Sequence, residues 1–169
     1  MGFTQSIVLA SCSFILGMVF VCQVVDIPLL YMPVTEQALQ NAYDFYEMWW
    51  EAPGAVKALF HVALALPMLA LIFKLNRWTE SAMFFDGSGV VMHLATIVLY
   101  LTVHIQSLRT FPERTEAVRV LAAANALVGL LTLGVIGMQV GQEYARRVEE
   151  REQREVDRAA VVQEGKKDI

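Results

Sequence analysis

The chain has 169 residues, a hydrophobic fraction of 56% and a mean hydropathy of +0.48, which places it above the ~45–50% apolar content of ordinary soluble domains. Half of its charged side chains lie in the last 29 residues, and its net charge is −4 with no basic face, which argues against a nucleic-acid partner. Its two cysteines form no CxxC motif, which argues against a thiol oxidoreductase. The composition favours a small polytopic membrane protein with a polar tail.

Four apolar runs are long enough to cross a bilayer, which needs about 20 mainly apolar residues in a helix. The second run is shorter and contains Pro67, but Lys57 and Lys74 at its ends extend it by snorkelling. A soluble four-helix bundle is the competing fold, and it would need polar helix faces that these runs lack. We therefore predict an all-α fold with a transmembrane domain over residues 1–141, whose spans cover about residues 5–25, 55–74, 86–106 and 118–141.

The first run lacks the basic start of a signal peptide and its apolar core is long, so we expect it to be retained as a span. An even number of spans places both termini on one side of the membrane. That side carries nine Lys and Arg residues and the other side carries four. By the positive-inside rule we predict that both termini face the cytosol.

The segment between the first two spans begins at about Asp26, and Pro28 and Pro33 are expected to break its start. Thr35 suits the N-cap of an amphipathic helix over about residues 35–51. Aromatic residues share one face of this predicted lumenal helix, and acids mark the other; the aromatic residues are Tyr43, Tyr46, Trp49 and Trp50. Two interpretations stay open, namely an anchor at the headgroup level of the membrane and a surface that contacts a client or partner.

Short loops and a charged tail complete the chain. Asp86-Gly87 suits a turn or a helix entry before the third span, and Pro112 is expected to break the loop after it. The cytosolic tail, residues 142–169, alternates acids and arginines at helical spacing, which is typical of a solvated helix. Lys166 and Lys167 stand fourth and third from the C-terminus, which is the position of the di-lysine signal read by the COPI coat. This signal predicts residence in the endoplasmic reticulum.

Polar residues inside the spans are expected to join helices. His93 and His61 sit toward opposite membrane faces, which argues against a haem between them, and His104 lies at the end of its span. The remaining candidates for interhelical contact lie in the fourth span: Asn125 and Gln139 as polar partners, and Gly137 with Gly141 as a GxxxG spacing for close packing. No nucleophile–base pair, phosphate loop or metal cluster is visible, so we predict no catalytic site, no cofactor and no metal.

Four stretches together resemble a known family. They are ALQNAYDFYEMWWEAP, FFDGSGVVMHLATIVLYLT, EAVRVLAAANALVGLLTLGVIGMQVGQEYARR and the charged tail. Their order and spacing, over about residues 6–150, are similar to those of the Shr-type membrane proteins, the fungal packaging chaperones for amino-acid permeases in the endoplasmic reticulum. The chain departs from the family at His104, where Asn is expected.

The resemblance implies a function without catalysis. Members keep newly inserted amino-acid permeases from aggregating and help them into COPII vesicles, so the implied partners are permeases, COPII components, the COPI coat and membrane lipid. Two alternatives stay open. One is a structural subunit of a membrane complex of the endoplasmic reticulum. The other is a lipid- or sterol-modifying membrane enzyme that uses intramembrane histidine and acids, for which His93 and the acidic loop are the support.

Overall fold

The computed structural model describes residues 2–76, 80–110 and 115–167, and these form helices without any strand. The predicted all-α class is confirmed. Four helices are long and apolar enough to cross a membrane, over Phe3–Tyr31, Gly54–Leu75, Ala82–Arg109 and Thr115–Ala159. The predicted break at Pro112 falls outside the described residues.

The first helix, α1 (Phe3–Tyr31), runs past its predicted end near residue 25. Pro28 lies inside it, although a proline within a helix costs about 3 kcal/mol. Leu29 and Val25 offset this cost because they are buried in an apolar cluster with α2 and α6. Asp26, expected in the loop, is therefore a helical residue with no exposed surface.

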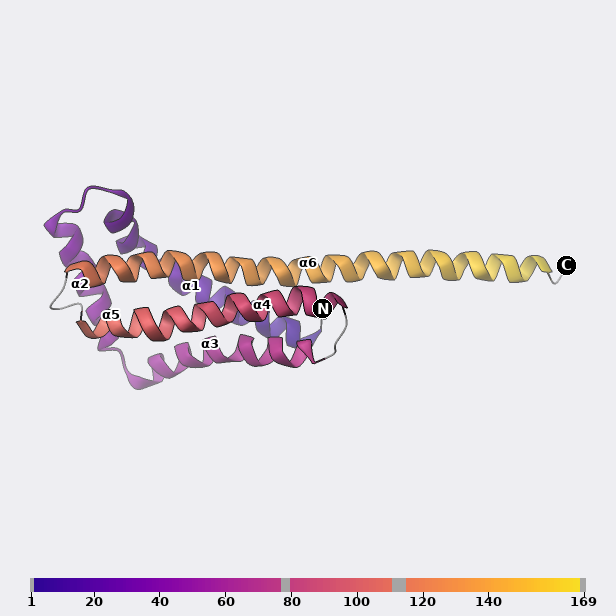
Figure 1. Cartoon of the computed structure of the whole chain (residues 1–169), viewed down its shortest axis with the longest axis horizontal. Coiled ribbons are helices and arrows are strands. Elements are labelled where there is room, and N and C mark those ends of the chain that lie inside the picture. Colours follow the sequence, from indigo (N-terminus) through magenta and orange to yellow (C-terminus); the bar gives the residue numbers. More distant parts are fainter. Residues whose placement is uncertain (1, 77–79, 111–114, 168–169) are drawn as a thin grey trace.

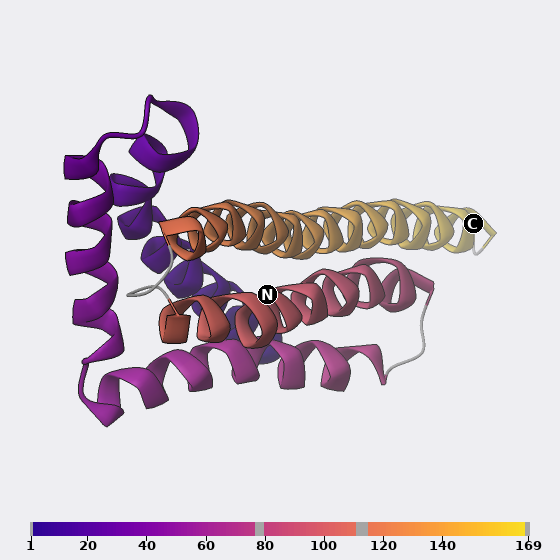
Figure 2. The same cartoon turned by 60° about the vertical axis from the view of Figure 1, so that its left-hand side comes forward.

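The second helix, α2 (Glu36–Trp50), begins at the predicted cap, where Thr35 Oγ1 accepts from the Ala38 backbone N–H at 3.1 Å. It contacts both α1 and α6, and in Figure 2 it runs across one end of the bundle. This end is called the α2 end below, and the opposite one the tail end.

The bundle itself consists of α1, α3 (Gly54–Leu75), α4 (Glu80–Leu99) and α6 (Thr115–Lys167). α1 packs against α3 and α6, and α4 packs against the same two helices, so the four form a closed ring (Figure 1). The third span continues from α4 through a π-helical turn, η1 (Tyr100–His104), into α5 (Ile105–Thr110). Because α4 begins at Glu80, Asp86 lies within this helix and not at the predicted turn.

The outer faces of the bundle are apolar. Phe20, Phe73 and Leu130 are 75%, 66% and 66% exposed, whereas Asp26, Asp86 and a set of amides are buried. This is the reverse of a soluble bundle, which shows its polar faces to water. The distribution suits lipid around the helices and sets the soluble alternative aside.

Toward its C-terminus, α6 leaves the bundle as a long single helix (Figure 1). At about 1.5 Å per residue, residues 150–167 extend roughly 27 Å beyond Glu149, which still lines a pocket with α1 and α3. Ion pairs along its surface join Glu143 to Arg146 and Arg147, and Glu150 to Arg146 and Arg154, at three- or four-residue spacing. Ion pairs on a helix surface contribute little each, and their regular spacing is typical of a solvated helix.

Candidate functional site

At the α2 end, four side chains from four elements form one hydrogen-bonded group, called the α2-end cluster: Asp26 of α1, Tyr46 of α2, His104 of η1 and Asn125 of α6. Tyr46 Oη donates to Asp26 Oδ1. Asn125 Nδ2 donates to Asp26 Oδ2 at 2.9 Å and to Tyr46 Oη at 2.8 Å. Both hydrogens of the amide are thereby used.

The same hydrogen bonds determine that Nε2 of His104 carries a hydrogen. Since the nitrogen of Asn125 is committed to Asp26 and Tyr46, its Oδ1 faces His104 Nε2 at 2.8 Å. An amide oxygen only accepts, so Nε2 carries the hydrogen and donates. His104 Nδ1 lies 3.2 Å from the Leu99 carbonyl, and the π-helical turn brings the ring into this position.

Burial makes the α2-end cluster a strong connection between elements. Asp26 has no exposed surface, and Tyr46 and Asn125 are each 4% exposed. Burial, followed by the nearby Asp26 carboxyl, raises the pKa of Tyr46, so the phenol keeps its hydrogen and donates it. A buried polar group without a partner costs about 1–3 kcal/mol. Undocking α2 would leave such groups unpaired in the bundle, so the cluster stabilises the contact of α2 with the bundle.

A second polar group, the tail-end cluster, joins all four spans at the other end. Lys74 Nζ lies 2.7 Å from Asp86 Oδ1, and Asp86 is 1% exposed. Two glutamines of α6 bracket this pair: Gln139 Nε2 and Gln142 Nε2 donate to the Asp86 carboxyl at 3.1 and 2.7 Å, and their side-chain oxygens accept from Lys74. Gln5 of α1 donates to the Gln139 carbonyl at 2.8 Å.

His93 lies between the two clusters and has no exposed surface. Its Nε2 is 2.8 Å from the Leu64 carbonyl of α3, and since a carbonyl only accepts, Nε2 donates. Its Nδ1 has no partner among the described residues. The contact ties α4 to α3 near Pro67 and brings no acid to the ring.

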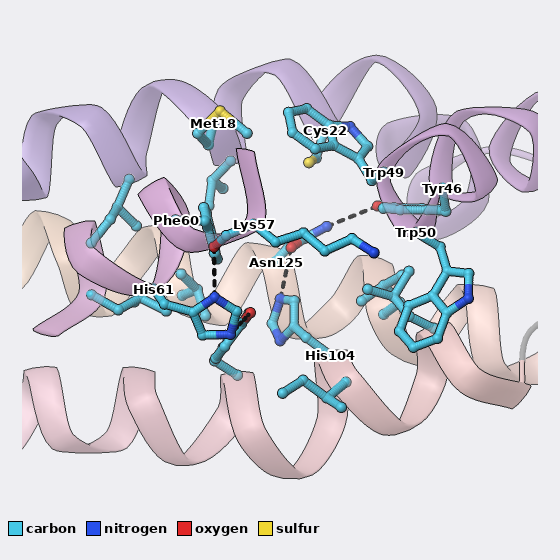
Figure 3. A pocket seen from close by; sticks show the side chains of 18 of the residues that line it. Met18, Cys22, Tyr46, Trp49, Trp50, Lys57, Phe60, His61, His104 and Asn125 are labelled. Carbon is cyan, nitrogen blue, oxygen red and sulfur yellow. Dashed lines mark hydrogen bonds between the residues drawn. The ribbon is translucent and has the colours of Figure 1, made fainter. Parts of the chain in front are cut away.

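A cavity of about 230 Å³ opens beside the α2-end cluster and is lined by every helix of the chain. Figure 3 shows His61, His104 and Asn125 around it, with Lys57 running across it toward Trp50. His61 Nδ1 donates to the Lys57 carbonyl at 2.6 Å, so its Nε2 accepts from Tyr100 Oη at 3.1 Å. The rest of the lining is mainly apolar.

The predicted aromatic residues of α2 have different surroundings. Tyr46 is buried in the α2-end cluster, and Tyr43 is half-buried against the neighbouring apolar residues. Trp49 lines the cavity, and its buried Nε1 has no partner among the described residues. Trp50 is 41% exposed, with Lys57 Nζ 5.4 Å from its ring centre.

The residues predicted for helix packing and for the retrieval signal also differ in their surroundings. A Cβ on Gly141 would stand 3.0 Å from the Phe85 ring, so this glycine permits close approach of α4 and α6. A Cβ on Gly137 would meet open space. Gln139 and Asn125 take part in the tail-end and α2-end clusters respectively. Lys166 and Lys167 form the last residues of α6.

Sequence reasoning missed the part that three charged residues play in the two clusters: Asp26, Lys74 and Asp86. Asp26 was assigned to a loop because of Pro28, yet the apolar residues that follow it were a signal that the span continues. Lys74 was expected to snorkel to the membrane surface, but its side chain is only 12% exposed and pairs with Asp86. Among the described residues, no three His, Cys, Asp or Glu side chains could hold a metal ion.

The fold and the two clusters define a class of protein: an α-helical, four-span membrane protein whose buried polar groups join its helices to one another. Comparison with known families identifies the particular one. The family model described as ER membrane protein SH3 matches residues 1–168, and the chain belongs to this SHR3 chaperone family. The family is one of chaperones and not of enzymes, which sets aside the lipid-modifying enzyme.

A curated relative supports the same family. The chain is 29% identical over 156 residues to the secretory component protein psh3 of Schizosaccharomyces pombe, with 88% of this chain and 72% of that protein covered. No solved structure matches the chain. The family makes this protein a chaperone of the endoplasmic-reticulum membrane, and the resemblance inferred from the sequence is confirmed.

Proposed function

We propose that the chaperone acts on newly inserted amino-acid permeases, keeps them from aggregating and promotes their loading into COPII vesicles. The observation that carries the proposal is the family match over residues 1–168, which covers all four spans and the tail. A permease in mid-assembly exposes small and weakly polar helix faces to lipid. A compact bundle with a complementary outer face can cover them until the permease is packed.

The outer face of α1 supports this role. Ser13 and Gly17 are exposed at small-xxx-small spacing, and a Cβ on Gly17 would meet no atom of the bundle. Small residues let two membrane helices approach closely, and van der Waals packing is the main attraction between helices in lipid. Because both residues lie on the outer face of α1, a client helix can approach them closely.

The proposed orientation places both termini in the cytosol and α2 in the lumen. The long extension of α6 would then project toward the vesicle coats, with Lys166 and Lys167 at its end. In this arrangement the di-lysine signal returns any chaperone that escapes with its client. Glycosylation acceptors inserted before Glu36 and after Gln153 test the orientation, because only a lumenal site is glycosylated.

The decisive experiment measures permease location and amino-acid uptake in cells that lack the protein and in cells that carry variants. Without the protein, permeases are expected to stall in the endoplasmic reticulum while other membrane cargo leaves. Gly17→Ile should impair export at normal chaperone abundance, whereas Ala65→Ile, also at an exposed position of a span but on α3, should not. Normal permease delivery without the protein would overturn the proposal, and stable one-to-one copurification with one partner would favour a structural subunit.

A further inference from the structure

The cavity at the α2 end has the size and lining of a site for an apolar chain. Its volume is about 230 Å³, and apolar protein cavities of about 150 Å³ already exclude water and admit a ligand such as benzene. Val19, Leu64 and Val128 contribute to its walls from α1, α3 and α6. An empty space of this size would forfeit contacts that a flexible hydrocarbon chain restores.

The polar groups of the cavity leave its interior apolar in character. Tyr100 Oη and His61 Nε2 bond to each other at 3.1 Å, and His104 Nε2 donates to Asn125 at 2.8 Å. Thr96, which also lines the cavity, donates to the Met92 carbonyl. These side chains have protein partners, whereas Trp49 Nε1, which also lines the cavity, has none among the described residues and is available to an acceptor on a ligand.

The cavity mouth has the opposite character. Trp50, Val56, Lys57 and His61 line the cavity and are exposed. Lys57 Nζ stands 5.4 Å from the centre of the Trp50 ring, and no ion pair joins it to a carboxylate of the described residues. Tryptophan and lysine beside a span are typical of the headgroup level of a bilayer.

Two exposed acids stand close to the mouth residues in the sequence. Glu51 stands in the chain between Trp50 and Ala52, which both line the cavity, and it is exposed. Glu47 is exposed one helical turn earlier on α2. A mouth region that carries both a lysine and exposed acids complements a headgroup that carries both a phosphate and an amine.

We propose that this cavity binds a zwitterionic glycerophospholipid from the leaflet at the α2 end, with one acyl chain between the spans and its phosphate at Lys57. The amine of the headgroup then lies toward the acids at the end of α2. The bound lipid fills the bundle where α2 crosses it and stabilises the α2 end. It is part of the resident chaperone and does not depend on which clients are bound.

The test uses the full-length protein in vesicles of phosphatidylcholine that carries a photoreactive group at the middle of one acyl chain. After illumination, cross-linked peptides are mapped by mass spectrometry. Cross-links are expected on lining residues such as Val19, Leu64 and Thr96, in addition to the outer faces of the helices. Cross-links confined to lipid-facing residues would overturn the proposal.

A matched pair of variants separates the cavity from the outer surface. Cys22 lines the cavity, and its neighbour Val21 is 47% exposed on the outside of α1. Cys22→Phe should reduce cross-linking of the lining residues several-fold, and Val21→Phe should leave it unchanged. Equal effects of the two substitutions would refute a lipid inside the bundle.

A second variant tests the headgroup contact without disturbing the core. Lys57 is exposed, and an exposed ion pair between a lysine and a phosphate is worth up to about a five-fold difference in binding. Lys57→Gln should weaken retention of phosphatidylcholine by native mass spectrometry by that factor. Preferential retention of phosphatidylglycerol by the parent protein, or a cavity cross-linked to a polypeptide in native membranes, would contradict the assignment. If Cys22→Phe fails to accumulate, this measurement decides alone.

Discussion

Replacing Tyr46 with Phe isolates the contribution of one hydroxyl group to the docking of α2. The ring stays, so the substitution opens no cavity, and it removes the hydrogen bonds to Asp26 Oδ1 and from Asn125 Nδ2. A hydrogen bond to a charged group contributes about 1.5–3 kcal/mol and a neutral one about 1 kcal/mol. Since Asp26 has no exposed surface that water could reach, we expect Tyr46→Phe to lower the free energy of unfolding by about 2–4 kcal/mol.

The assay is unfolding by denaturant in detergent micelles, followed by tryptophan fluorescence, because Trp49 and Trp50 lie on the helix that should undock. Tyr31→Phe is the control, since Tyr31 is 74% exposed at the end of α1. The double variant with Asp26→Asn should lose less than the sum of the two single variants. If Tyr46→Phe falls within about 0.5 kcal/mol of the control, the α2-end cluster does not hold α2.

Three further substitutions probe the rest of the bundle. Lys74→Met should destabilise the protein by about 3–5 kcal/mol, because it leaves the buried Asp86 carboxyl without its cation, and adding Asp86→Leu should recover part of that loss; thermal unfolding measures both. Gly141→Val should cost about 1–3 kcal/mol by overpacking, whereas Gly137→Val, with open space around it, should stay within about 0.5 kcal/mol. His93→Leu should cost only about 0.6 kcal/mol and leave permease delivery intact, and a complete loss of delivery at normal abundance would reopen a chemical role for this residue.

The class of fold and the number of spans could be predicted because few backbone conformations can cross a lipid bilayer. A charge-free run of sufficient length forms a helix in a bilayer, since its backbone polar groups have no other partner there. The periodicity of residues 35–51 likewise predicted a helix with Tyr46 and Trp49 on one face. Periodicity does not say what covers such a face, and here it is largely protein: α1 and α6 bury Tyr46.

The polar clusters could not be predicted, because local sequence rules do not show which residues become buried against other helices. Local rules assign Asp26 to a loop because Pro28 follows it, and they assign Asp86 to a turn because Gly87 follows it. In both cases the burial of neighbouring residues outweighs the local preference. The partners of these carboxyls are far away in the chain, since Asn125 is 99 residues from Asp26 and Gln139 is 53 residues from Asp86.

The positions of the two clusters bear on how a membrane chaperone can release its clients. Polar groups exposed to lipid would bind any client that offers an unpaired donor or acceptor, and such contacts are slow to exchange in a medium without competing water. Here Asp26, Asp86 and His93 are bonded inside the bundle. The outer faces therefore offer mainly van der Waals contact, which is weak per residue and readily lost when the client completes its own packing. On this argument, burying the polar groups gives the chaperone both a stable bundle and contacts weak enough to be transient.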